Sequence, residues 1–134
     1  MVTVAESASL FPLAVFLGMN VETTGVGTGR ATITIDQRHH NPNAVAHGGV
    51  LFTMIDTSMG AATMSVLDAG HYCSTIEIQV RYLRPVPDGD LTVETQVIKP
   101  GRRIVHLESR ATDGTGRLVA TATGSYAVLP IPSA

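Results

Sequence analysis

The chain has 134 residues, the length of one small domain, and 44% of them are hydrophobic, which is enough to fill a core and excludes intrinsic disorder. Only 15% are charged, against about 25% in ordinary soluble domains, so we expect a subunit interface to cover further surface. A net charge of −2 gives no basic excess of the kind that nucleic-acid binding needs. A single cysteine excludes an internal disulfide, and no apolar run reaches the roughly 18 residues that span a bilayer. The apolar stretch 10–19 lacks a basic start, so we expect a cytoplasmic protein with no membrane and no nucleic-acid partner.

The first predicted element is a short helix over residues 9–17, which Pro12 interrupts early and Gly18 ends. Residues 30–36 alternate apolar and polar side chains, as a half-buried strand does. A polar loop then leads into one long helix over residues 48–67, where alanine, methionine and leucine show no strand alternation. This helix is apolar almost all round, so we expect it to be buried.

Four consecutive strands are predicted after the helix, between residues 74 and 128. Alternating side chains mark residues 75–83, 91–98, 104–112 and 118–128, and proline and glycine mark the turns between them. No repeat or linker divides the chain, so residues 1–134 are expected to form a single domain. The predicted fold class is α+β, an antiparallel sheet wrapped around one long buried helix.

Asp56 is the only carboxylate between Asp36 and Asp68, and it lies in the middle of the most apolar helix. Burying an ionised carboxylate without partners is costly. Spacings of three and four residues place it on one helix face with residues that are small or polar: Gly49, Thr53, Gly60 and Thr63. A structural aspartate that bonds a neighbouring strand is one interpretation. The isolation of the charge and the small face favour the other, a reactive carboxylate.

The second feature is the loop–helix junction that ends in His47-Gly48-Gly49. The first N–H groups of a helix lack intrahelical partners and carry the positive end of its dipole, and glycine lets a ligand oxygen approach them closely. We therefore expect Gly49 to polarise a carbonyl or hold an oxyanion, with Asn41 donating an amide hydrogen to the same oxygen. A simple tight turn is the alternative for the glycine pair. For His47, a structural histidine and a catalytic one are both open.

Gly49 and Asp56 are separated by about 10 Å along the helix, at about 1.5 Å per residue. One small reacting group cannot meet both. Either the two residues serve different sites, or Asp56 comes from a second copy of the chain. The small helix face and the low charge favour a two-fold dimer with two equivalent composite sites.

Several motifs follow one another along the chain: His39 and Asn41, then His47-Gly48-Gly49, with Asp56 nine positions after His47. With these motifs the chain resembles the hotdog-fold acyl-CoA thioesterases of the PaaI-like family. The resemblance covers roughly residues 11–128 and includes Leu17-Gly18-Met19, Tyr82-Leu83-Arg84-Pro85 and Lys99-Pro100-Gly101-Arg102. One position departs from the family pattern: Ala44 stands where members usually carry glycine. If that position has a positive φ, alanine strains the loop.

The resemblance implies hydrolysis of an acyl-CoA thioester to a free acid and coenzyme A. It implies that Asp56 is the general base or the nucleophile, that Gly49 and Asn41 hold the thioester carbonyl, and that Thr75 orients the attacking water. Family members are homodimers or homotetramers built as dimers of dimers, and their sites are shared between subunits. Coenzyme A is part of the substrate, and no cofactor is implied.

Coenzyme A carries phosphates, for which arginine is well suited. Arg84, Lys99, Arg102 and Arg103 lie in or beside two turns that could face one end of the sheet, although ordinary solvated turn charges are the alternative. The histidines have no acidic ligand at a recognisable spacing, so no metal site is predicted.

Two rival functions are open. A hotdog module that senses acyl-CoA without cleaving it is one, and the intact Asp56 argues against it. An enoyl-CoA hydratase or dehydratase of the same fold is the other, and the spacing of His47 and Asp56 does not supply its chemistry. The acyl group itself is not predicted.

Overall fold

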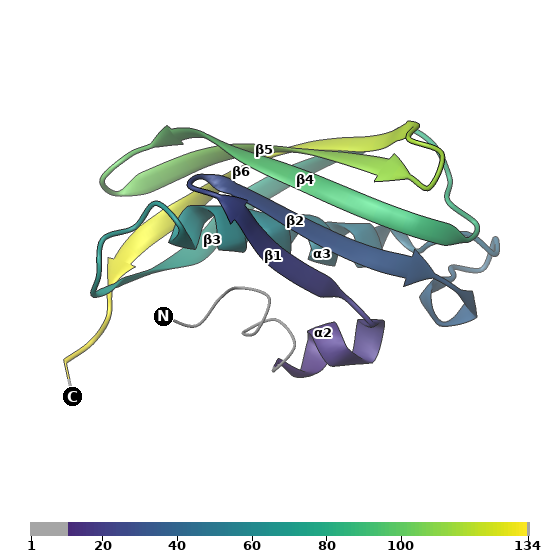
Figure 1. Cartoon of the computed structure of the whole chain (residues 1–134), viewed down its shortest axis with the longest axis horizontal. Helices are drawn as coiled ribbons and strands as arrows, with labels where there is room; N and C mark the ends of the chain where they lie inside the picture. Colours follow the sequence, from purple (N-terminus) through teal and green to yellow (C-terminus); the bar gives the residue numbers. More distant parts are fainter. Residues whose placement is uncertain (1–10, 134) are drawn as a thin grey trace.

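The computed structural model describes residues 11–133 and consists of one antiparallel sheet that arches over a long helix (Figure 1). The helical elements are α2 (Pro12–Leu17), the short 3-10 helix η1 (Gln37–His39) and α3 (Gly48–Met64). The strands are β1 (Asn20–Gly25), β2 (Thr28–Ile35), β3 (His71–Tyr82), β4 (Gly89–Pro100), β5 (Ile104–Asp113) and β6 (Leu118–Pro130). They lie in the order β1-β2-β4-β5-β6-β3, so α3 connects β2 to the opposite edge of the sheet. The predicted fold class is therefore confirmed.

α3 packs one broad side against the sheet, and residues 11–133 leave its other side partly exposed. On the inner side Met54 and Met59 are completely buried. On the outer side Phe52 is 39% and Met64 43% exposed, and Asp56 is half-buried. The predicted long helix is therefore buried on the side that faces the sheet, whereas its other side is partly exposed in a single copy of the chain. No helix among the described residues is long and apolar enough to cross a membrane.

Two glycines allow α3 to approach the sheet closely. A Cβ at Gly29 on β2 would lie 2.7 Å from the carbonyl oxygen of Ser58, and a Cβ at Gly124 on β6 would lie 2.5 Å from Met59 Sδ. Ser58 also donates a hydrogen bond of 2.8 Å to the buried Thr95 hydroxyl on β4. Because buried hydroxyls need partners, this bond fixes the position of the helix along the sheet. It thereby fixes the side chains that α3 presents to β3 and β6.

The amino-terminal part differs most from the sequence prediction. Pro12 begins α2 instead of interrupting it, and Gly18 ends it with a φ of +67°; residues 9 and 10 lie outside the described residues. The strand β1 was not predicted. Val21 is its only buried residue, so the alternation that marks a half-buried strand is absent. α3 ends at Met64 rather than at residue 67.

β1 and β3 are the edge strands of the sheet. β3 pairs with β6 along its length, and its other edge meets no strand within residues 11–133. Ile76 on this strand is 53% exposed. Natural proteins usually protect a long strand edge with charged residues, proline or a covering element. An unpaired edge with exposed apolar side chains therefore favours pairing with another chain.

Candidate active site

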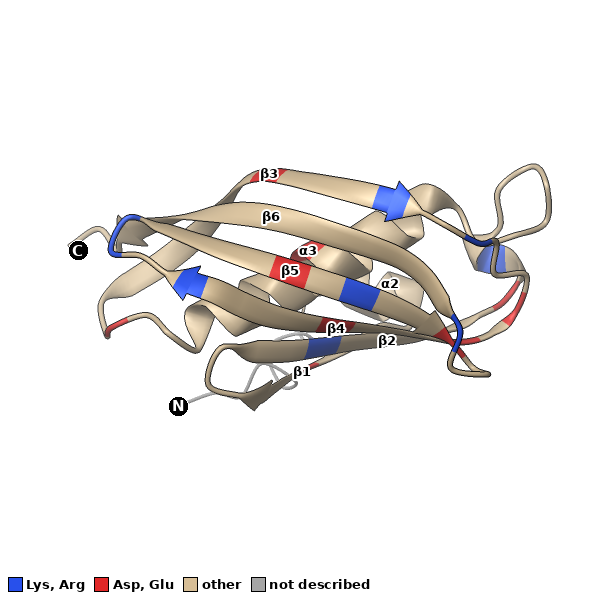
Figure 2. Cartoon of the chain, turned by 90° about the horizontal axis from the view of Figure 1, so that it is seen from above, with Lys and Arg blue, Asp and Glu red and all other residues tan. Residues whose placement is uncertain are grey.

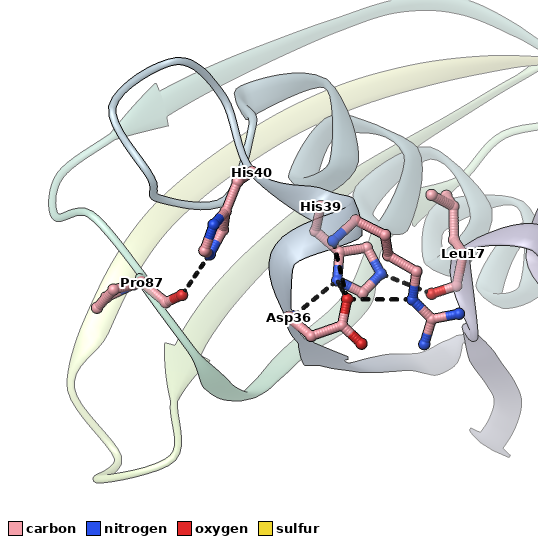
Figure 3. A network of polar contacts seen from close by, with 6 residues as sticks. Leu17, Asp36, His39, His40 and Pro87 are labelled. Atoms are coloured by element: carbon pink, nitrogen blue, oxygen red, sulfur yellow. Dashed lines mark hydrogen bonds and ion pairs between the residues drawn. The ribbon is translucent and has the colours of Figure 1, made fainter.

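Two histidines fix the start of the loop that precedes α3 (Figure 3). His39 is buried; its Nδ1 accepts the backbone N–H of Asp36 at 3.0 Å, and its Nε2 donates to the Leu17 carbonyl at 2.8 Å. His40 Nε2 donates to the Pro87 carbonyl at 2.7 Å. The loop is therefore anchored to the end of α2 and to the segment between β3 and β4. Within the motif, His39 has a structural role.

Asn41 begins a tight loop that its own side chain stabilises. Its Oδ1 accepts the N–H of Asn43 at 2.8 Å, and its backbone N–H donates to the Val45 carbonyl at 2.8 Å. Oδ1 is thus used inside the loop, and no described residue accepts a hydrogen bond from the side-chain nitrogen Nδ2, which can donate to a ligand. Ala44 has a φ of +60°, so the strain expected of alanine at this position is present.

His47 caps the amino end of α3. Its backbone is extended, and its Nδ1 accepts the Gly49 N–H at 2.8 Å. The N–H that was predicted to bind a carbonyl is therefore bonded to the histidine ring, and it can reach a ligand only when the ring turns aside. The Gly48 N–H donates to no acceptor among residues 11–133. Gly48 therefore supplies the open donor at the helix start, and the sequence reasoning did not choose it.

A cavity of about 310 Å³ opens beside the amino end of α3. Asn41, Gly48, Tyr82 and Arg84 line it together with apolar residues, among them Leu51, Leu83, Val86 and Leu91. The Tyr82 hydroxyl donates to the Gly48 carbonyl at 2.7 Å. A Cβ at Gly48 would lie 3.2 Å from the end of the Tyr82 side chain, so a larger residue at position 48 would push the tyrosine slightly aside. The structure thus gathers Asn41, Arg84 and the helix start around one cavity.

Asp56 lies farther along α3, and two hydroxyl groups hold its carboxylate. Thr75 on β3 donates to Oδ1 at 2.7 Å. The Tyr126 hydroxyl on β6 shares its one hydrogen between the same oxygen and the backbone carbonyl of Asp56. No residue within 11–133 donates a hydrogen bond to Oδ2. The carboxylate is therefore fixed through one oxygen and presents the other.

Tyr126 is the residue of this site that the sequence reasoning missed. It lies 70 positions after Asp56, and its place in the alternation of β6 is that of an ordinary core residue. One signal was available: Tyr126 is the only aromatic residue between positions 118 and 130. Burial, together with the hydrogen bond to Asp56, raises the pKa of Tyr126, so the hydroxyl stays protonated and donates. Burial, with the nearby charge of Asp56, also raises the pKa of Cys73 to about 11.

Within one chain the two parts of the candidate site stay apart. Gly48 and Asp56 are eight residues apart on one helix, about 12 Å along its axis. Asp56 does not line the cavity that contains Asn41 and Gly48. The structure therefore brings Asp56 together with Thr75, and Asn41 together with Gly48, but does not join the two pairs.

The four predicted basic residues do not share one end of the sheet within a chain, so that expectation is wrong (Figure 2). Arg84 follows β3 beside the start of α3, whereas Lys99, Arg102 and Arg103 lie in or beside the turn between β4 and β5. β4 runs the length of the sheet between the two turns, which places them at opposite ends. Arg102 and Arg103 line a separate cavity of about 710 Å³ near the carboxyl end of α3.

Comparisons with known proteins give the family. Residues 43–120 match the family model of the thioesterase superfamily. A protein of Saccharolobus solfataricus, provisionally named an esterase, is 31% identical over 113 residues, which cover 84% of this chain and 75% of that protein. A solved thioesterase of Haemophilus influenzae superposes with a TM-score of 0.88 at 24% identity, covering 95% of this chain and 89% of that one. The PaaI protein from the phenylacetic acid degradation operon of Escherichia coli superposes with a TM-score of 0.84 at 23% identity, covering 94% and 91%.

The matched segment spans more than half of the chain and includes Gly48, Asp56 and Thr75, whereas Asn41 and Tyr126 lie outside it. The two superposed structures show that the sheet and its central helix form the hotdog fold. Thioester hydrolysis is the class of reaction that these matches support. The chain therefore belongs to the thioesterase superfamily, as the motifs predicted.

Proposed function

We propose that the chain hydrolyses acyl-coenzyme A thioesters to a free acid and coenzyme A, with Asp56 as the reactive carboxylate. The arrangement of that carboxylate carries the proposal: Oδ1 accepts two hydroxyl hydrogen bonds, and Oδ2 accepts none from residues 11–133. Oδ2 also lies on the helix that keeps one face open in a single chain. A carboxylate held in this way can take a proton from water or attack an acyl carbon.

Both routes end in the same products. As a general base, Oδ2 takes a proton from water while the water oxygen bonds to the acyl carbon; the C–S bond then breaks, and the thiolate leaves and takes up a proton. As a nucleophile, Oδ2 itself bonds to the acyl carbon and expels the thiolate. Water then opens the resulting anhydride, which releases the acid and restores the Asp56 carboxylate, and the remaining proton goes to the thiolate. Thioesters are reactive enough for a carboxylate and one carbonyl site to suffice, and no cofactor is needed.

The amino end of α3 is the carbonyl site of this proposal. The N–H of Gly48 and the Nδ2 of Asn41 both have hydrogens to donate, and both residues line the cavity of about 310 Å³. The positive end of the helix dipole adds to their effect on the carbonyl oxygen. Gly49 contributes only when His47 turns away, so we assign to His47 the task of holding the helix start.

A second copy of the chain completes each site. Reacting groups must come within about 3 Å of one another, and about 12 Å of helix separates Gly48 from Asp56. The open face of α3 and the unpaired edge of β3, where Ile76 is exposed, support a two-fold dimer. In this dimer Asp56 of one subunit meets the helix start of the other. A dimer of dimers would hold four such sites.

Arg84 is the basic residue that lines the carbonyl cavity, and we assign it to the phosphates of coenzyme A. The planar guanidinium group binds phosphate oxygens through paired hydrogen bonds. Lys99, Arg102 and Arg103 lie at the other end of the sheet, so they reach the same ligand only from a partner subunit.

Thiol release from a panel of aryl-, phenylacetyl- and medium-chain acyl-CoA esters tests the proposal. Wild-type protein should release thiol from at least one ester, and Asp56→Asn should keep its circular dichroism spectrum and lose turnover by about a hundredfold or more. Binding of esters without thiol release would favour a sensing module. Consumption of an enoyl-CoA ester without thiol release would favour hydration. Turnover near the wild-type rate in Asp56→Asn would exclude Asp56.

A further inference from the structure

Tyr126 reaches from the inner face of β6 to the middle of α3. The residue is 2% exposed. Its ring packs beside Gly60, where an added Cβ would lie 4.0 Å from Cε2. Its one hydroxyl hydrogen is shared between Asp56 Oδ1 and the Asp56 backbone carbonyl. Tyr126 therefore contacts both the side chain and the main chain of the residue to which we assign the chemistry.

The two carboxylate oxygens of Asp56 differ in their hydrogen bonds. Oδ1 accepts hydrogen bonds from the hydroxyls of Thr75 and Tyr126, whereas Oδ2 accepts none from residues 11–133. Because both hydrogen bonds end on Oδ1, they restrict the rotation of the carboxylate and leave Oδ2 available to a ligand. The titratable groups that face Asp56 within residues 11–133 are Cys73 on β3 and Tyr126 on β6, and a raised pKa keeps each of them uncharged at neutral pH.

We infer that Tyr126 is a positioning residue: its hydroxyl holds Oδ1 of Asp56 so that Oδ2 faces the substrate. The expected effect on turnover rests on the proposed function, whereas the hydrogen bond that holds the Asp56 carboxylate can be tested without it. Thr75 lies on an exposed part of β3, whereas Tyr126 is enclosed between β6 and α3. The buried donor keeps its bond in competition with water, and we therefore give it the larger part in fixing the carboxylate.

Tyr126→Phe tests the inference because it removes the hydroxyl and keeps the ring. Hydrogen bonds to charged groups are among the stronger ones, so we expect kcat to fall about tenfold to a hundredfold while KM changes less than about twofold. A loss of kcat with KM nearly unchanged separates the positioning of the carboxylate from a loss of substrate binding. Tyr72→Phe is the matched control: Tyr72 is an exposed tyrosine on β3, and its variant should keep the wild-type kcat and KM.

A second measurement does not depend on turnover. At pH 7 the NMR chemical shift of the Asp56 carboxyl carbon, in protein labelled with ¹³C-aspartate, should differ between wild type and Tyr126→Phe, because Oδ1 has lost a hydrogen bond. An unchanged chemical shift and an unchanged kcat in Tyr126→Phe would overturn the inference. Wild-type protein without thiol release on any ester would contradict the proposed function instead, and the chemical shifts would still decide the role of Tyr126.

Fluorinated tyrosine at position 126 provides the test if the phenylalanine variant does not fold. A 2,3-difluorotyrosine keeps the ring and the hydroxyl and makes the hydroxyl a stronger donor. We expect this substitution to change the chemical shift of the Asp56 carboxyl carbon at pH 7. A chemical shift that stays at the wild-type value would overturn the inference.

Discussion

Ala44 has a left-handed backbone conformation, with a φ of +60°, in the loop that carries Asn41. This conformation costs about 1 kcal/mol for a residue with a Cβ, because the Cβ comes close to the following carbonyl oxygen. The loop keeps its shape through backbone hydrogen bonds to either side: Ala44 donates to the Asn41 carbonyl at 3.0 Å, and Ala46 donates to the Val86 carbonyl at 2.8 Å. The strain therefore lies in one residue and can be relieved there.

Ala44→Gly should increase the free energy of unfolding by up to about 1 kcal/mol, because glycine adopts a positive φ without the steric cost. Chemical denaturation of the two proteins measures the difference. Ala69→Gly serves as the control: Ala69 is exposed and has no positive φ, and glycine there should lower stability by making the unfolded chain more flexible. Equal destabilisation by both substitutions would show that Ala44 is not strained.

At the scale of the elements, the turn between β5 and β6 depends on one ionised side chain. Oδ1 of Asp113 accepts the Thr115 hydroxyl at 2.7 Å and the backbone N–H groups of Thr115 and Arg117, each at 3.0 Å. The hydrogen bond from the Thr115 hydroxyl, followed by that from the Arg117 N–H, lowers the pKa of Asp113. The folded protein thus favours the ionised form. The resulting stability is present above the ordinary pKa of aspartate and is lost as pH falls through the lowered folded value.

Asp113→Ala should therefore lower the melting temperature by a few degrees at pH 7, and the gap to wild type should narrow as the pH falls to about 3 and below. Thermal unfolding over this pH range measures the gap. Asp88→Ala, at an exposed aspartate that accepts no side-chain hydrogen bond from the described residues, should leave the melting temperature close to that of wild type. A gap that stays constant with pH would contradict the role assigned to the ionised carboxyl.

The elements that the sequence predicted are those with a clear apolar pattern. α3 and the four strands after it have such a pattern, whereas β1 contributes only Val21 to the core and gives no signal. The isolation of Asp56 in the chain singled it out, but its contact with Tyr126 depends on how β6 lies against α3. Which glycine, Gly48 or Gly49, has a free N–H depends on the orientation of the His47 ring. That orientation cannot be predicted from the sequence.

In the whole molecule, the order of the strands determines which residues lie close enough to act on one substrate. Because β4 returns along the full sheet, Arg84 and the β4–β5 turn lie at opposite ends of one chain. α3 likewise separates Asp56 from the cavity beside Gly48. In the dimer that we propose, a two-fold axis perpendicular to α3 would reverse the direction of the second helix. The middle of one helix would then lie against the amino end of the other, and residues that are distant in one chain would come together.

Mixed dimers test this arrangement directly. Asp56→Asn and Asn41→Ala subunits, each inactive alone, should form a heterodimer that has one intact site and about half of the wild-type turnover, because the intact Asp56 and the intact Asn41 meet across the axis. Differently tagged chains allow the heterodimer to be purified and its thiol release measured. In the control, a subunit with both substitutions pairs with a wild-type subunit. If the sites are shared, this control is inactive; if each chain holds a whole site, it keeps half of the activity and the first heterodimer has none.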